Sequence, residues 1–134
     1  MIQNLNQFKK WLEVGKEIKF VKNVILPEKA GMTRKITKVQ TNGLYTEIEG
    51  KNSWLEIPKA KDVIIEDGKI NMLSDFLSKY DTDYLDKLKN LPNMQNRYEE
   101  QLQTIQKRKQ ELLDNGAEFI NDNQYIWLSI EPVM

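Results

Sequence analysis

Hydrophobic residues recur at two different spacings along this chain of 134 residues, and the spacing predicts where helices and strands lie. At the start, Leu5, Phe8 and Leu12 follow one another at helical intervals after Asn4, a residue type that favours helix N-caps. After Gly15 the period changes to two, which is typical of strands with one buried face. We therefore expect a short amphipathic helix followed by a β-rich segment.

Turn sequences divide residues 16–73 into short strands. They are Asn42-Gly43, Gly50-Lys51-Asn52 and Asp67-Gly68, together with Pro58, which ends a strand because proline cannot donate to a β-ladder. Five short strands joined by tight turns are typical of a small closed or partly open barrel, because closure removes exposed sheet edges. We expect residues 1–73 to form a helix plus a small five-stranded, SH3-like β-barrel, with the helix covering one open end.

Helical spacing returns at Ser74. One apolar stripe continues to Pro92, with Asp75 in the first turn, where the helix dipole favours a negative charge, and with Asp81 as the cap of a restarted helix. A second stripe occupies residues 93–115. The first stripe consists of Leu77, Tyr80, Tyr84, Leu88 and Leu91, and the second of Met94, Tyr98, Leu102, Ile105 and Leu112. The short link at Pro92 favours an antiparallel helical hairpin in which the two stripes bury each other.

The last segment has the pattern of a β-hairpin. Ala117–Ile120 and Tyr125–Ile130 flank four polar residues. A lone hairpin is marginal in water, so this one must dock on the helices or on the edge of the barrel. The predicted fold class is α+β, with residues 74–134 forming the helical hairpin and terminal β-hairpin and packing with residues 1–73 as one compact unit.

Composition restricts the chemistry of the protein. The chain has no Cys and no His, so the strongest nucleophile, the commonest general base and the commonest metal ligand are all missing. Two acidic pairs remain as cation sites, Asp81 with Asp83 and Glu47 with Glu49. A helix start and a solvated strand face explain both pairs without a metal. With no glycine-rich phosphate loop either, we expect a protein that is not an enzyme and holds no cofactor and no metal.

Charge is distributed unevenly, although 20 basic and 20 acidic side chains balance over the whole chain. Residues 1–73 carry 13 basic and 9 acidic side chains, and residues 74–134 carry 7 and 11. Two candidate partner-binding surfaces follow. The first groups Lys16, Lys19, Arg34, Lys38 and Lys51 beside Tyr45, and the second comprises Glu99, Gln103, Lys107 and Gln110 on the outer face of the long helix. The basic surface suits either a protein or a nucleic acid, and the glutamates interleaved with its lysines weigh against nucleic acid.

Three segments carry a family resemblance. They are Leu12-x-Val14-Gly15, Arg34-Lys35-Ile36-x-Lys38-Val39-Gln40-x-Asn42 and Gly50-Lys51-x-Ser53-Trp54-Leu55-Glu56-Ile57-Pro58-Lys59-Ala60. Together they resemble a family of small proteins without an assigned activity, encoded by bacteriophages and other mobile elements of Gram-positive bacteria. The resemblance implies an anti-CRISPR-like accessory protein that binds a host protein, such as a Cas nuclease, and inhibits a bacterial defence complex by protein–protein contact. A nucleic-acid-binding accessory protein is the alternative.

The expected location is the cytoplasm of the bacterial host, because the N-terminus lacks the apolar core of a signal peptide and no stretch approaches about 18 consecutive apolar residues. A membrane partner is therefore not expected. Lys109 interrupts the apolar stripe of the long helix, which makes a long coiled-coil dimer less favourable. A monomer and a homodimer both remain open.

Overall fold

The protein has an α+β fold, and its computed structural model describes residues 2–134. The chain divides into two units. The first unit comprises the described N-terminal residues up to Leu73 together with Ile126–Met134. The second unit comprises Ser74–Tyr125. The C-terminal residues therefore belong with the β-rich part of the chain and not with the helices that precede them.

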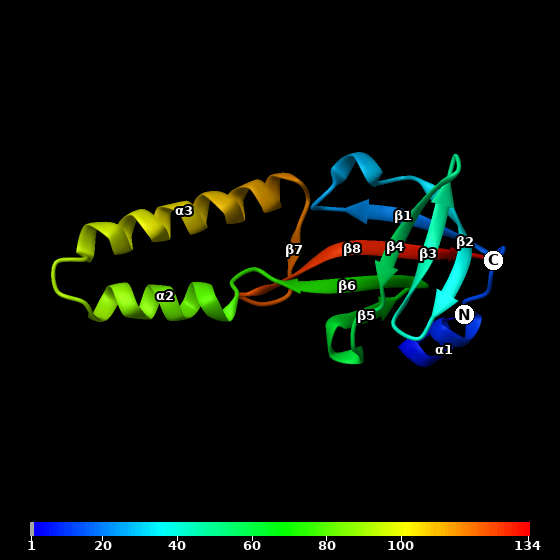
Figure 1. Ribbon diagram of the computed structural model, residues 1–134, viewed down its shortest axis with the longest axis horizontal. Coiled ribbons are helices and arrows are strands. Elements are labelled where there is room, and N and C mark those ends of the chain that lie inside the picture. The colour runs from blue at the N-terminus through cyan, green and yellow to red at the C-terminus, as the bar shows by residue number, and fades with distance from the viewer. Residues whose placement is uncertain (1) are drawn as a thin grey trace. The chain divides into compact units, whose positions relative to one another are not determined.

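The strands form one open antiparallel sheet in the order β4-β3-β2-β1-β8-β6-β5 (Figure 1). The strands are β1 Glu17–Asn23, β2 Thr33–Gln40, β3 Gly43–Ile48, β4 Lys51–Glu56, β5 Val63–Glu66, β6 Lys69–Asp75 and β8 Gln124–Val133. The short strand β7, Glu118–Phe119, pairs with β8 outside this order, and two short 3-10 helices, η1 Pro27–Lys29 and η2 Ala60–Asp62, connect strands.

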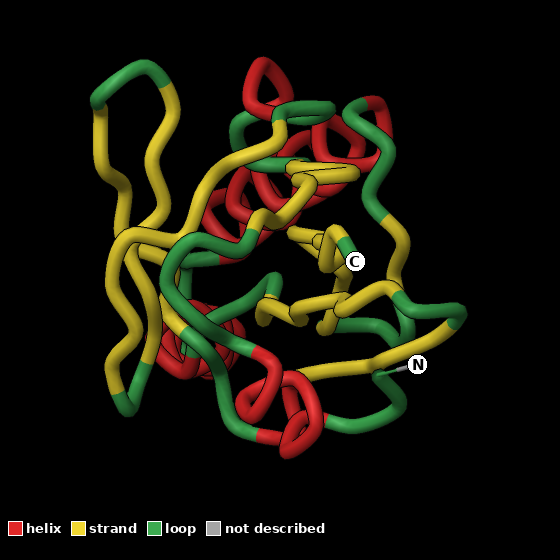
Figure 2. Tube along the Cα trace, turned by 90° about the vertical axis from the view of Figure 1, so that its right-hand side faces the viewer, coloured by secondary structure: helices red, strands yellow, loops and turns green. Residues whose placement is uncertain are grey.

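The described sheet is open, so the closed form of the predicted five-stranded barrel is not present. The described sheet ends at β4 on one side and at β5 on the other. The physical reason is the last strand, β8, which pairs with β1 from Glu17 opposite Val133 to Asn23 opposite Leu128 and separates β1 from the β5–β6 hairpin. The strands still curve around a shared interior and do not lie in one flat layer (Figure 2).

The interior is filled by the inward-facing residues of the strands and by the N-terminal helix α1, Leu5–Trp11. Asn4 caps this helix as predicted, because its side chain accepts a hydrogen bond from the Gln7 N–H at 2.9 Å. Phe8 is fully buried and packs in one cluster with strand residues such as Ile36 and Leu44. One face of this helix is therefore part of the core.

The predicted hairpin at Asn42-Gly43 forms, but Gly43 is needed for a different reason. Gly43 is the first residue of β3 and pairs with Gln40, so the connecting residues are Thr41 and Asn42. A Cβ atom on Gly43 would lie 2.6 Å from Cζ2 of Trp54 and would also collide with the backbone oxygen of Leu55. Glycine at this position therefore lets the Trp54 ring and the backbone of β4 approach β3 closely.

The second unit contains the predicted helical hairpin, with α2 at Lys79–Asn90 and α3 at Gln95–Asp114. The predicted helix start at Ser74 is wrong, because residues 74 and 75 still belong to β6 and Ser78 is the N-cap of α2. Ser78 Oγ accepts the N–H of Asp81 at 3.1 Å, and the Asp81 carboxylate accepts the N–H of Ser78 at 3.0 Å. Asp81 thus completes a capping box and does not restart a helix.

Tyr80 does not join the buried stripe that its spacing predicts. Its side chain is 76% exposed and stacks on Tyr84, with the ring centroids 6.3 Å apart. Tyr80 remains on the same stripe, four residues before Tyr84, but it lies in the first turn of α2. Leu88 and Ile105 are buried, as the stripes predict.

Candidate functional site

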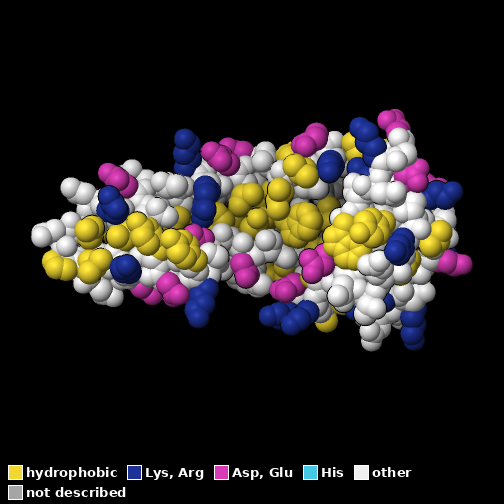
Figure 3. Space-filling model, viewed as in Figure 1, with side chains coloured by type: hydrophobic (Ala, Val, Ile, Leu, Met, Phe, Trp, Pro, Cys, Tyr) yellow, Lys and Arg dark blue, Asp and Glu magenta, His cyan; other side chains and the backbone are white. Residues whose placement is uncertain are grey.

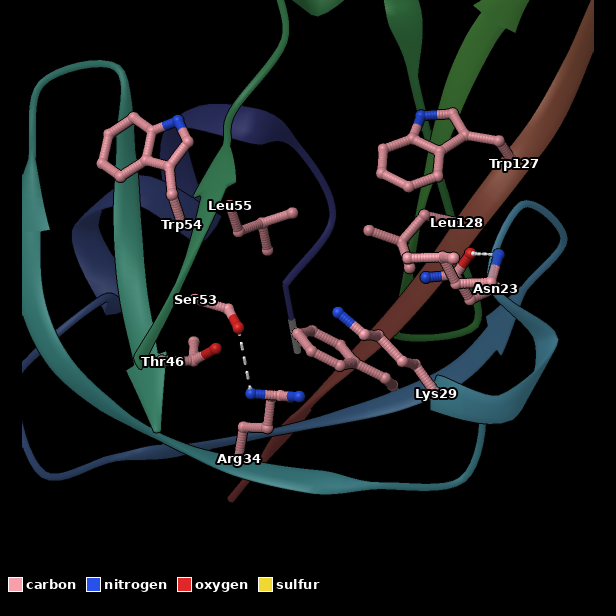
Figure 4. A pocket seen from close by; sticks show the side chains of 11 residues that line it. Asn23, Lys29, Arg34, Thr46, Ser53, Trp54, Leu55, Trp127 and Leu128 are labelled. Carbon is pink, nitrogen blue, oxygen red and sulfur yellow. Dashed lines mark hydrogen bonds between the residues drawn. The ribbon is translucent and has the colours of Figure 1, made fainter. Parts of the chain in front are cut away.

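A cavity of about 140 Å³ lies in the first unit between the edge strand β4 and strand β8 (Figure 4). Its walls include two aromatic rings and two cationic side chains. The rings belong to Phe20 and Trp127, the cations to Lys29 and Arg34, and the hydroxyl groups of Thr46 and Ser53 add polar atoms. No acidic residue lines the cavity.

Strand alternation places Arg34 on the inner face of the sheet. Arg34 lies directly opposite Ile18 on β1, and two residues further along β2 Ile36 lies opposite Thr46 on β3. Side chains two apart on a strand share a face, so Arg34 points to the same side as the fully buried Ile36. The Arg34 side chain is accordingly buried, with only 5% of the residue exposed.

The guanidinium group of Arg34 is poorly satisfied for a buried cation. Its Nη1 donates to Ser53 Oγ at 3.4 Å, which is a long hydrogen bond, and its Cζ lies 5.7 Å from the centre of the Phe20 ring. Its buried Nε has no hydrogen-bond partner among the described residues, and neither has the buried Oγ1 of Thr46. Arginine has five N–H donors in a fork that matches a carboxylate or a phosphate, and at least the Nε–H of Arg34 is left for such an acceptor.

Lys29 adds a second positive charge to the same cavity. It stands on η1, and Figure 4 shows its side chain directed toward the space between Arg34 and Trp127. Within residues 2–134 neither Lys29 nor Arg34 forms an ion pair. Two cations that face one small space without a carboxylate create a positive potential there, which favours an anion.

The predicted basic surface is only partly brought together. Lys38 lies opposite Tyr45, whose ring contacts that of Trp54 with the centroids 5.0 Å apart. Lys19 points to the other side of the sheet from Arg34, because its neighbour Ile18 is the residue that lies opposite Arg34.

The remaining lysines of that surface are paired or stand apart. Lys16 donates to the Trp11 carbonyl oxygen at 3.0 Å and forms an ion pair with Glu13 at 3.6 Å. Lys51 is exposed at the first position of β4. Lys19 lies opposite Glu131 on β8, so an acidic residue accompanies this lysine as well.

The sequence interpretation missed Lys29 and Trp127 as members of a site and placed Arg34 on an outer surface. The sequence did contain a signal that Arg34 faces inward. Arg34 lies two residues before the apolar Ile36, and residues two apart on a strand share a face. No comparable signal exists for Lys29 and Trp127, because about 100 residues separate them and only the pairing of β8 with β1 brings their segments together.

The second unit carries the other predicted surface. Glu99, Gln103, Lys107 and Gln110 are all exposed on α3. Two of them contact their own helix: Glu99 accepts from Gln95 at 3.2 Å and Gln110 donates to Asp114 at 2.9 Å. Apolar side chains also form a row along this helical hairpin (Figure 3).

Asp81 has a structural role within this unit. The hydrogen bond from the Ser78 backbone N–H lowers the pKa of the Asp81 carboxyl, with a smaller contribution from Arg108, whose Nη2 lies 3.9 Å away. Among residues 2–134 no cluster of three or more acidic side chains is placed to hold a metal ion. The capping box explains Asp81 without a cation.

No protein-family model, curated protein or solved structure matches this chain. Within residues 2–134, no helix is both long and apolar enough to cross a membrane. The cavity around Arg34 is the feature of the molecule with the most specific chemistry.

Proposed function

We propose that this protein is a non-catalytic binding protein that accepts an acidic side chain of a protein partner in the cavity around Arg34. The observation that supports the proposal is the buried guanidinium group that lacks an anionic partner. Burying a charge without a partner is unfavourable, because the group loses its hydration and gains no compensating contact. A partner carboxylate would supply that contact with the bidentate geometry that arginine prefers.

The dimensions of the cavity favour a side chain over a larger ligand. Its volume of about 140 Å³ is well below the range of roughly 300–1,000 Å³ that is usual for sites of small organic ligands. The rings of Phe20 and Trp127 offer apolar contact to the methylene groups of a glutamate, while Arg34 and Lys29 face its carboxylate.

A nucleic-acid partner is less well supported. Binding to a phosphate backbone requires several cations that are not neutralised by neighbouring acids. On this sheet Lys35 lies opposite Glu47 and Lys19 lies opposite Glu131, so the exposed lysines alternate with carboxylates.

The resemblance to proteins of mobile elements supplies the class of partner. We extend the proposal to inhibition of a bacterial defence complex, such as a Cas nuclease, by contact that blocks a working surface in the cytoplasm of the host cell. The cavity would then anchor one acidic residue of that complex.

Affinity capture with matched variants tests this function. Tagged wild-type protein is used to capture proteins from a lysate of Gram-positive bacteria, next to Arg34→Met and the exposed control Lys35→Met. Truncating one member of a buried charge pair costs about 2–5 kcal/mol, which is a loss of roughly 30-fold or more in affinity. We expect a host protein that wild type and Lys35→Met retain and Arg34→Met loses.

Two outcomes would contradict the proposal. One is the recovery of no host protein by the wild type. The other is equal recovery of the same proteins by Arg34→Met, which would place the contact elsewhere on the molecule. If a Cas nuclease is recovered, unchanged DNA cleavage at excess protein would refute inhibition and leave the binding role intact.

A further inference from the structure

We infer that the partner segment is an extended peptide that adds a strand to the free edge of β4 and directs an acidic side chain into the cavity. This inference rests on the proposed function and specifies how the acidic group arrives. It requires a free strand edge and a cavity on the inner side of that edge. It also requires that the inward side chains of an added strand lie at the positions of the cavity residues.

The edge of β4 is available for pairing. Strand β4 is the last strand in the sheet order and, in the described part of the chain, pairs only with β3. The N–H of Ile57 donates to the carbonyl oxygen of Asn42 at 2.8 Å, which identifies this pair as hydrogen-bonded. Bonded and non-bonded pairs alternate in an antiparallel ladder, so the backbone N–H and C=O groups of Asn52, Trp54 and Glu56 point away from β3.

The free edge borders the cavity. Ser53 and Leu55 lie on the inner face of β4 and line the cavity from one side, and Leu128 of β8 lines it from the other (Figure 4). A strand added to β4 would lie about 4.8 Å from it, between β4 and β8 and across the cavity. Every second side chain of that strand would point inward.

The positions of the inner side chains define a recognition pattern. An inward residue beside Ser53 would reach Arg34, because Arg34 Nη1 is already 3.4 Å from Ser53 Oγ. The next inward residue, two positions along the peptide, would lie beside Leu55 and near Trp127, where an apolar side chain fits. The expected pattern is an acidic residue and an apolar residue separated by one position.

The middle of this edge lacks the usual protection against pairing. Natural edge strands are blocked by proline, bulges or charged residues, and in β4 the charged residues Lys51 and Glu56 stand only at its ends. Strand β4 pairs with β3 without a bulge, and its exposed residues include Trp54, which is 43% exposed. Apolar side chains gather over this strand on the molecular surface (Figure 3). Main-chain pairing with an exposed edge and pockets for alternate side chains is a general mode of peptide recognition.

Binding of designed peptides to the full-length protein tests the inference. The probe is a blocked nine-residue peptide, Thr-Thr-Val-Thr-Glu-Thr-Val-Thr-Thr, whose Val, Glu and Val side chains share one face in either chain direction. The matched peptide has Gln in place of Glu. A second pair carries N-methyl groups either on the two Thr residues beside Glu or on the two Val residues. In an antiparallel pairing, which the rest of this sheet uses and which we infer for the peptide, the N–H groups of those Thr residues would face β4 and those of the Val residues would not.

We expect the Glu peptide to bind at least about tenfold more tightly than the Gln peptide, and Arg34→Met to abolish the difference. N-methylation of the two Thr residues is expected to weaken binding at least about tenfold, and N-methylation of the two Val residues less than about threefold. In the protein, Glu56→Pro removes one outward N–H, and we expect it to weaken binding relative to Glu56→Gln.

The outcomes separate this inference from the proposed function. A preference for Glu that is insensitive to both N-methylation patterns would overturn strand addition and leave the carboxylate site intact. Absence of peptide binding would overturn strand addition in the same way, while binding without any preference for Glu would contradict both claims.

Discussion

Replacing Arg34 with methionine is expected to increase the stability of the isolated protein. The guanidinium group is buried and its Nε has no partner, so its removal relieves a desolvation penalty of about 1–3 kcal/mol. Methionine has a similar length, contains no polar donor and adapts to irregular spaces between apolar neighbours. Urea unfolding at pH 7 measures the effect as a higher midpoint with an unchanged m-value.

Two controls separate the effect of the cavity from a general effect of charge. Arg34→Lys keeps a positive charge at the same place and is expected to give no gain in stability. Lys35→Met removes an exposed charge from the neighbouring position and is expected to change the free energy of unfolding by less than about 0.5 kcal/mol. A loss of stability in Arg34→Met would show that the contacts to Ser53 and Phe20 make Arg34 a structural residue, which contradicts a role in binding.

Phe8→Ala is expected to lower the free energy of unfolding by about 3–5 kcal/mol, because the ring is fully buried against the interior of the sheet and the space left behind cannot collapse. This is a large fraction of the total stability of a typical domain, which is about 5–15 kcal/mol. Urea unfolding followed by circular dichroism measures the loss.

The controls for this prediction use the same helix. Lys9→Ala changes an exposed neighbour and is expected to stay within about 0.5 kcal/mol of the wild type. Phe8→Leu keeps an apolar side chain and is expected to lose less than Phe8→Ala, which gives a measurable value even if the alanine variant does not fold. A loss below about 1 kcal/mol in Phe8→Ala would mean that helix α1 does not cover the core in solution.

Local features of the fold could be predicted from the sequence because they depend on neighbouring residues. Asn4 caps its helix, Pro58 follows the end of β4, and the helical hairpin turns at Pro92. Each depends on capping, on the missing N–H of proline or on helical spacing, and these act within a few residues. The predicted boundaries of elements were wrong by a few residues where the strand period of two passes into the helical period, as between β6 and the start of α2.

The order of the strands in the sheet could not be predicted in this way. It depends on the pairing of β8 with β1, two strands about 100 residues apart in the chain. Turn sequences specify only neighbouring strands, and nothing in the pattern of residues 124–133 identifies β1 as their partner. The cavity follows from that pairing, which is why Trp127 was not recognised as part of a site while Arg34 was at least a candidate.

The most direct test of the central claim is titration of the protein with a blocked glutamate, N-acetyl-glutamate α-amide, observed by NMR at the Nε–H of Arg34. We predict a saturable shift of this signal, accompanied by a shift of the Trp127 indole N–H signal, and no such shifts with the blocked glutamine. The Trp127 shift should be absent from Arg34→Met. An Arg34 Nε–H signal that does not respond to blocked glutamate up to about 0.1 M, far above a millimolar Kd, would contradict a carboxylate site in this cavity.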